Sequence, residues 1–187
     1  MRLFIALPLP REIEEELGRI IFILKQKGGG GRIKWVAPKN IHMTVRFLGD
    51  TDDDKSPAIK EAIQRVASRH RVVESIVDTL GAFPDLKRPR VFWAGLSGGI
   101  EILDSIAGDM EEEMRRLGFP REDKKFKPHL TLGRVKESYG LDDLAGYIRN
   151  YQVAAKPFRL DKLVLFKSIL TPQGPIYSRL LEANLKS

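Results

Sequence analysis

Ile41-His42-Met43-Thr44-Val45-Arg46-Phe47-Leu48-Gly49 is a stretch in which polar residues alternate with apolar ones. Successive side chains of a β-strand point to opposite faces, so this pattern predicts a strand with His42, Thr44 and Arg46 on one face. The apolar residues between them are then left for a core on the other face. From such a strand an imidazole can move protons near neutral pH and a hydroxyl can donate a hydrogen bond, both to one small anionic group.

A second stretch, Pro128-His129-Leu130-Thr131-Leu132-Gly133-Arg134, repeats this pattern at about half the chain length. His129 and Thr131 share one face, with the two leucines on the other. Strict alternation places Arg134 on the face opposite His129. A repeat at this separation predicts two similar lobes, each of which contributes one strand to a shared site.

The composition is that of an ordinary globular protein, with 187 residues of which 42% are hydrophobic, enough to bury a sizeable core. The 32 Lys and Arg residues against 25 Asp and Glu give a net charge of +7, which favours an anionic partner such as nucleic acid or phosphate. The absence of Cys removes disulfides, thiolate zinc sites and a cysteine nucleophile, and it agrees with a reducing, cytoplasmic location. The apolar run within residues 1–8 is too short for a signal peptide or a membrane span and predicts a first strand.

Helices and strands are expected to alternate along the rest of the chain. Helical spacing of apolar residues predicts helices over residues 11–27, from the carboxylates at 50–54 to near His70, over 100–117 and over 141–148. Further strands are predicted over residues 32–36, 74–83, 90–96, 158–170 and 175–185. The class is α+β, mostly antiparallel sheet with helices packed outside, as two lobes around a cleft. Phe92 and Trp93 are adjacent on a strand, so at most one faces a ligand, and core packing is favoured for them.

The two stretches contain two of the three histidines of the chain. A pair of imidazoles across a phosphate can perform acid–base chemistry, because one accepts a proton from the attacking oxygen while the other donates one to the leaving oxygen. The two threonine hydroxyls can donate hydrogen bonds to the non-bridging oxygens. A zinc site needs more ligands than the two motif histidines provide, and no further His stands in the motifs and no Cys in the chain. We therefore expect no metal. His70, near a helix C-terminus, is left out of the chemistry.

The motifs His42-Met43-Thr44-Val45 and His129-Leu130-Thr131-Leu132 resemble those of the 2H phosphoesterases. Longer strings resemble one branch of that superfamily, the RNA 2',3'-cyclic phosphodiesterases, also described as 2'-5' RNA ligases. These strings are Arg2-Leu3-Phe4-Ile5-Ala6, Trp35-Val36 with Pro38 and Asn40, Phe47-Leu48-Gly49, Gly81-Ala82-Phe83-Pro84, Pro89-Arg90-Val91-Phe92-Trp93-Ala94-Gly95 and Phe126-Lys127-Pro128 before the second motif. The resemblance covers nearly the whole chain.

This resemblance implies one domain over residues 1–187, built from two intertwined lobes with pseudo-twofold symmetry around a central cleft. It implies no metal or nucleotide cofactor, and opening of a 2',3'-cyclic phosphate RNA end, as on tRNA fragments, to a 2'-phosphate. By this analogy His42 is the proton donor to the leaving 3'-oxygen and His129 is the proton acceptor that activates water. Thr44 and Thr131 hold the phosphate. We expect a cytoplasmic monomer without membrane contact.

Basic residues near the motifs are candidates for substrate binding. Arg134 is the first of them, followed by Arg46 and Lys127. The loop before the second motif is basic and is expected to guide a phosphate to the site; it contains Arg121, Lys124, Lys125 and Lys127. Two alternatives stay open, namely the reverse reaction that joins a 2',3'-cyclic end to a 5'-hydroxyl, and an RNA-binding module without catalysis.

Overall fold

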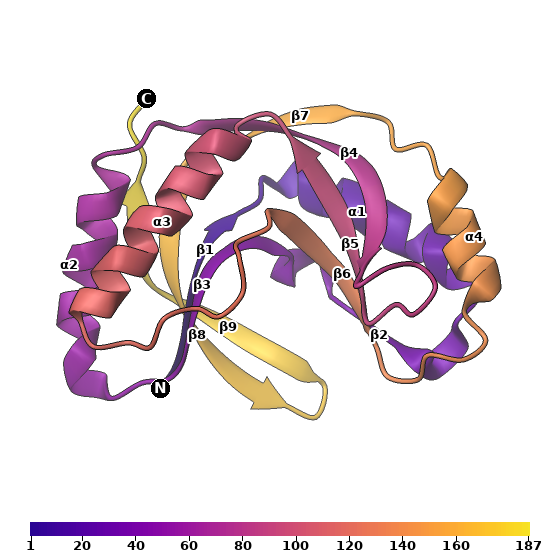
Figure 1. Cartoon of the computed structure of the whole chain (residues 1–187), viewed down its shortest axis with the longest axis horizontal. Helices are drawn as coiled ribbons and strands as arrows, with labels where there is room; N and C mark the ends of the chain where they lie inside the picture. Colours follow the sequence, from indigo (N-terminus) through magenta and orange to yellow (C-terminus); the bar gives the residue numbers. More distant parts are fainter.

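Two antiparallel sheets and four α-helices make up the computed structural model, which describes residues 1–187 (Figure 1). The first sheet has the strand order β3-β1-β8-β9, from β1 (Arg2–Pro8), β3 (His42–Asp50), β8 (Lys162–Thr171) and β9 (Gly174–Asn184). The second has the order β2-β6-β5-β4-β7, from β2 (Ile33–Trp35), β4 (Val73–Phe83), β5 (Val91–Ser97), β6 (His129–Val135) and β7 (Lys156–Leu160). Three single-turn 3₁₀ helices, Gly30–Arg32, Pro38–Asn40 and Asp53–Lys55, complete the elements.

The helices lie outside the sheets and bury one stripe of apolar residues each. They are α1 (Arg11–Gln26), α2 (Ser56–Ala67), α3 (Ile100–Arg116) and α4 (Asp142–Asn150). In Figure 1, α2 and α3 lie side by side, and they contact each other and the four-stranded sheet. α4 packs on β4 of the five-stranded sheet. No helix is both long and apolar enough to cross a membrane.

The core joins both sheets. One cluster of 39 buried residues includes Ile5 of β1 and Phe92 of β5, and neither side chain is exposed to solvent. A smaller cluster lies on the other face of the four-stranded sheet and consists of Phe4, Ala6, Val164 and Phe166. Alternate side chains of β1 belong to one cluster and then to the other, so the four-stranded sheet is apolar on both faces. The smaller cluster marks the face on which His42 lies.

The predicted α+β class, with antiparallel sheets and outer helices, is confirmed. One predicted strand is wrong, because residues 158–170 form two strands that belong to different sheets. β7 pairs with β4, whereas β8 pairs with β1 and β9, and only Asp161 separates them. Asp161 is a single polar residue that favours a turn, and a prediction that treats residues 158–170 as one apolar run passes over it.

Candidate active site

The two histidine motifs lie on neighbouring strands of different sheets. His42 is the first residue of β3 and His129 is the first residue of β6. The two strands contact each other where the sheets meet, near the middle of the molecule (Figure 1). Thr44 and Thr131, two residues further along, keep the alternation and lie partly buried beside their histidines. The structure therefore brings both His-x-Thr pairs to one region.

Both imidazoles are oriented by a backbone group two residues earlier in the chain. Nδ1 of His129 lies 2.6 Å from the carbonyl oxygen of Lys127. A carbonyl only accepts, so Nδ1 carries the proton and Nε2 is left for a substrate. His42 has the corresponding bond to the backbone of Asn40.

Aromatic rings surround both histidines. The ring of His42 stacks on Phe4, with 4.8 Å between centroids, and lies 6.0 Å from Phe166 and 5.6 Å from Tyr177. The sequence analysis did not identify these three residues as part of the site. The alternation of β1 could have placed Phe4 outside the main core, but Phe166 and Tyr177 reach His42 only through strand pairing.

The surroundings of His129 are built in the same way from other residues. Phe83 meets its ring edge-on at 5.0 Å, and Trp93 lies 5.3 Å from Phe83. Phe92 is fully buried, as predicted, while its neighbour Trp93 pairs with Thr131 on the histidine face. The sequence could not decide which of the two aromatic residues faces the site.

Burial governs the protonation of both imidazoles. It lowers the pKa of His42 to about 4, against the opposing effect of the Asn40 backbone bond. It also lowers the pKa of His129, where the Lys127 carbonyl opposes the shift and the charge of Arg134 adds to it. Both rings are therefore neutral at pH 7 in the free protein. A bound anionic phosphate favours the charged imidazolium and would raise both pKa values.

A β-bulge follows Thr44 in β3. Ala6 lies opposite Thr44, but its neighbour Ile5 lies opposite Arg46, so Val45 is an extra residue on β3. One extra residue reverses the alternation that follows it, until a second bulge at Leu48 restores it. Arg46 and Phe47 therefore lie on the faces opposite to those that strict counting assigns.

Arg46 accordingly turns away from the face of His42, and the prediction that the two share a face is wrong. The arginine is buried, with 7% of its surface exposed. Its Nε lies 2.8 Å from Oε2 of Glu111, in an ion pair too bent for a hydrogen bond, and Nη1 donates to Glu122 at 2.8 Å. Nη2 donates to the carbonyl of Pro120. These contacts attach β3 to α3 and to the loop before β6, so Arg46 does not reach the site as a phosphate ligand.

The same bulge occurs in β6, with the opposite result for its arginine. Trp93 lies opposite Thr131 and its neighbour Phe92 lies opposite Gly133, which makes Leu132 the extra residue. Arg134 therefore lies on the face of the histidine, and the prediction that it lies on the opposite face is wrong.

Electrostatic effects agree with this position of Arg134. Its charge contributes to the lowered pKa of His129. Burial raises the pKa of Tyr177 on β9, and the same guanidinium acts against that shift. Arg134 thus lies near residues of both sheets. Lys127, the other candidate, is exposed and holds its Nζ 5.7 Å from the centre of the Phe83 ring, beside His129.

His70 lies apart from these residues. Its Nε2 is 2.9 Å from Oδ2 of Asp109 on α3. No group of three or more His, Cys, Asp and Glu residues is arranged to hold a metal ion.

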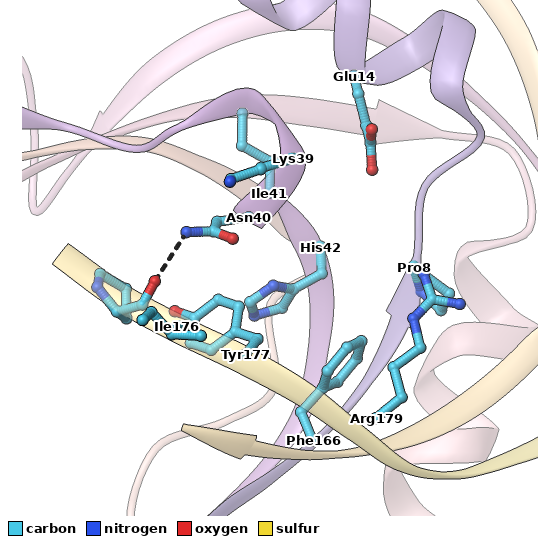
Figure 2. Close-up of a pocket in the computed structure, with 11 residues that line it drawn as sticks. Pro8, Glu14, Lys39, Asn40, Ile41, His42, Phe166, Ile176, Tyr177 and Arg179 are labelled. Carbon is cyan, nitrogen blue, oxygen red and sulfur yellow. Dashed lines mark hydrogen bonds between the residues drawn. The ribbon is translucent and has the colours of Figure 1, made fainter. Parts of the chain in front are cut away.

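A pocket of about 250 Å³ adjoins His42 on the side of α1 and the β8–β9 pair (Figure 2). Phe166 and Tyr177 contribute aromatic rings to its wall, and Glu14, Lys39, Asn40 and Arg179 contribute polar groups. His129 is not among its lining residues. The pocket therefore extends the site beyond one of its two histidines.

Known proteins share both the sequence and the fold of this chain. A family model described as LigT like Phosphoesterase matches residues 7–93 and 97–177. The RNA 2',3'-cyclic phosphodiesterase of Archaeoglobus fulgidus is 37% identical over 186 residues, which cover 96% of this chain and 98% of that protein. The protein of that name from Methanocaldococcus jannaschii is 36% identical over 183 residues, covering 97% of this chain and 99% of its own.

Solved structures give the same result. TT0787 of Thermus thermophilus has a TM-score of 0.80 at 26% identity, and the match covers 100% of this chain and 98% of that one. Escherichia coli LigT complexed with 3'-AMP shares the fold, with a TM-score of 0.77 at 23% identity over 100% of this chain and 98% of its own. This chain belongs to the LigT-like phosphoesterase family of the 2H superfamily, and the resemblance of its motifs is confirmed.

Proposed function

We propose that this protein is an RNA 2',3'-cyclic phosphodiesterase that opens a cyclic phosphate end to a 2'-phosphate. One observation carries the proposal: two His-x-Thr strands from different sheets meet. In each strand the imidazole is hydrogen-bonded to the backbone of the residue two positions before it. The name shared by relatives at 36% and 37% identity supports it. Those names describe hydrolysis, which favours this reaction over ligation and over a binding module without catalysis.

The proposed reaction uses the two imidazoles in opposite protonation states. Neutral His129 accepts a proton from water through Nε2, and the water oxygen attacks phosphorus. The bond from phosphorus to the 3'-oxygen breaks as protonated His42 donates its proton to that oxygen. The product is a 2'-phosphate with a free 3'-hydroxyl. Thr44, Thr131 and Arg134 donate to the non-bridging oxygens, where charge develops.

The low pKa of His42 in the free protein is compatible with a role as acid only if substrate raises it. The cyclic phosphate brings a negative charge next to partly buried imidazoles, where its effect on their pKa values is larger than in water. The order of events is then binding first and protonation of His42 second. The charge of Arg134 favours the neutral form of His129, which suits its role as the base.

We further propose that residues 1–187 act as one domain of two lobes and as a cytoplasmic monomer on RNA ends, including those of tRNA fragments. The net charge of +7 and the basic loop before β6 support an RNA partner. The absence of Cys supports a reducing compartment.

The direct test is turnover of a nucleoside 2',3'-cyclic phosphate and of an RNA with that end, followed by ³¹P NMR of the product. We expect a 2'-phosphate, at a rate that excess chelator leaves unchanged. A 3'-phosphate product, or activity that chelator removes and added metal restores, would contradict the proposal.

A further inference from the structure

The pocket beside His42 contains a carboxylate that the reaction does not use. Glu14 extends from α1 toward the space bordered by His42 and Asn40 (Figure 2). Its helix neighbours Glu15 and Glu16 form ion pairs with Arg11 and Arg19, whereas Glu14 forms none. Burial raises its pKa, and the nearby charges of Arg179 and Arg11 oppose that effect.

A carboxylate at this position is unfavourable for a second phosphate. Like charges repel, and partial burial strengthens the repulsion. A carboxylate is an acceptor of hydrogen bonds, so it suits a neutral ligand that offers N–H or O–H groups. The carboxylate of Glu14 therefore favours a neutral part of the substrate over a second phosphate in this pocket.

Asn40 adds a second acceptor to the same pocket. Its Nδ2 donates to the carbonyl oxygen of Pro175 at 3.2 Å, which fixes the amide and leaves Oδ1 for a ligand (Figure 2). Tyr177 offers an aromatic ring for stacking, whereas Phe166 is buried and stacks on Phe4. Two acceptors and a stacking surface match the amino edge and the flat face of a nucleobase. Lys39 and Arg179 of the same pocket are donors that can meet its ring nitrogens and carbonyl oxygens.

The proposed reaction places a nucleoside on this side of the site. His42 donates its proton to the 3'-oxygen of the ribose, so the ribose lies against His42 while water lies against His129. The pocket adjoins His42 and does not include His129. Its volume of about 250 Å³ is near the lower limit, roughly 300 Å³, of small-molecule sites and suits one nucleoside.

We infer that this pocket is a subsite for the terminal nucleoside of the RNA, in which Glu14 accepts a hydrogen bond from an exocyclic amino group of the base. This inference rests on the proposed function, because the assignment of His42 to the 3'-oxygen sets the side on which the nucleoside lies. Bases with an amino group are favoured over uracil. At the position where cytosine has its amino group, uracil has a carbonyl oxygen, and the carboxylate repels that oxygen.

The test compares two substrates that differ only in the pyrimidine, cytidine and uridine 2',3'-cyclic phosphate. We expect kcat/KM of the wild-type protein to favour cytidine by about tenfold, the lower value for one hydrogen bond to a charged group. Glu14→Gln, whose amide can both donate and accept, should bring the ratio close to one. Glu12→Gln is the matched control, because Glu12 lies exposed on the same helical turn and outside the pocket.

Binding of the products 2'-CMP and 2'-UMP separates this inference from the proposed function. A protein that hydrolyses neither cyclic nucleotide but binds 2'-CMP more tightly, in a Glu14-dependent way, would contradict the reaction and support the subsite. Hydrolysis of both substrates with a wild-type ratio near one would overturn the subsite and leave the reaction intact. A preference for cytidine that Glu14→Gln leaves unchanged would also overturn the role of Glu14.

Discussion

The motif strands β3 and β6 begin alike and diverge after the same bulge. Each has a histidine, an apolar residue, a threonine and an extra apolar residue. The next two residues are Arg46 and Phe47 in β3, but Gly133 and Arg134 in β6. Each strand thus has one arginine, displaced by one position between the two. The displacement puts one arginine in buried ion pairs and the other on the histidine face.

This difference shows that a shared motif does not assign shared roles to the residues that follow it. In β3 the site-facing position after the bulge holds Phe47, which is 57% exposed and lies 6.1 Å from Phe4. In β6 the same position holds a cation. The two halves of the site are therefore alike in their acid–base groups and unlike in charge.

The largest expected effect concerns what the two strands share. His42→Ala and His129→Ala should each lower kcat by about a hundredfold or more, the usual loss for a general acid or base. The double variant should lose less than the product of the two factors, because the pair acts as a unit. Rates across pH should follow a bell-shaped curve that belongs to the pair.

His70→Ala is the control for these variants, because His70 contacts α3 and lies outside the site. Circular dichroism of every variant tests its folding. A folded His129→Ala protein with near wild-type turnover would show that the chemistry belongs to other residues.

The second prediction separates the two arginines. Arg134→Ala should lower kcat/KM by about ten- to a hundredfold, since a charge-assisted hydrogen bond to phosphate is lost, and should leave the melting temperature unchanged. Arg46→Met should instead lower the free energy of unfolding by about 1 to 3 kcal/mol, because the hydrogen bonds of a buried guanidinium are lost while Glu111 and Glu122 stay partly solvated.

Urea unfolding and steady-state kinetics on both variants measure this contrast. An Arg46→Met protein that is as stable as the wild type, or an Arg134→Ala protein that loses stability but no activity, would reverse the roles assigned to the two residues.

The third prediction concerns the lowered pKa values of the two imidazoles. The pKa of His42 is about 4 in the folded protein, below the ordinary value of 6.5 that an unfolded chain retains. Between these values the unfolded state binds more protons, so stability falls as pH is lowered from 6.5 to 4. The contribution is at most about 3 kcal/mol, at 1.36 kcal/mol per unit of pKa.

The free energy of unfolding is measured across pH for the wild type and for His42→Gln. The difference between the two profiles isolates this effect. The same subtraction for His129→Gln should give a loss in the same direction, since burial lowers its pKa also. A difference profile for His42 that is flat between pH 4 and 6.5 would contradict the cause assigned to its pKa.

The smallest expected effect concerns the segments that lead into the two strands. The loop before β6 holds Arg121, Lys124 and Lys125, all exposed, whereas the turn Pro38–Asn40 before β3 holds Lys39 alone. RNA affinity should fall with salt, with a slope of about 0.7 per phosphate contact for single strands. Lys124→Ala with Lys125→Ala should reduce that slope.

Lys25→Ala, an exposed change on α1, is the matched control and should leave the salt dependence as it is in the wild type. Fluorescence anisotropy with a labelled RNA measures both. A slope that the double variant retains in full would remove the loop from the RNA-binding surface.

The sequence was sufficient to identify the two strands and their histidines, because alternation is a local property of each strand. It was insufficient for Arg46 and Arg134, since a bulge is defined by the pairing of β3 with β1 and of β6 with β5. Phe166 and Tyr177 reach His42 from the far end of the chain, and the change of sheet at Asp161 depends on which strands β7 and β8 pair with. Glu14 is one of several acidic residues on α1, and only the folded chain distinguishes it.

The bond from His129 to the backbone two residues before it has a consequence for how such sites arise. The group that selects the tautomer and the imidazole itself belong to one short run of sequence, so the motif brings its own orientation with it. Duplication of that run supplies a second oriented imidazole without any change elsewhere in the protein. Grafting it onto the start of an edge strand in an unrelated sheet should therefore transfer a histidine with Nε2 already presented.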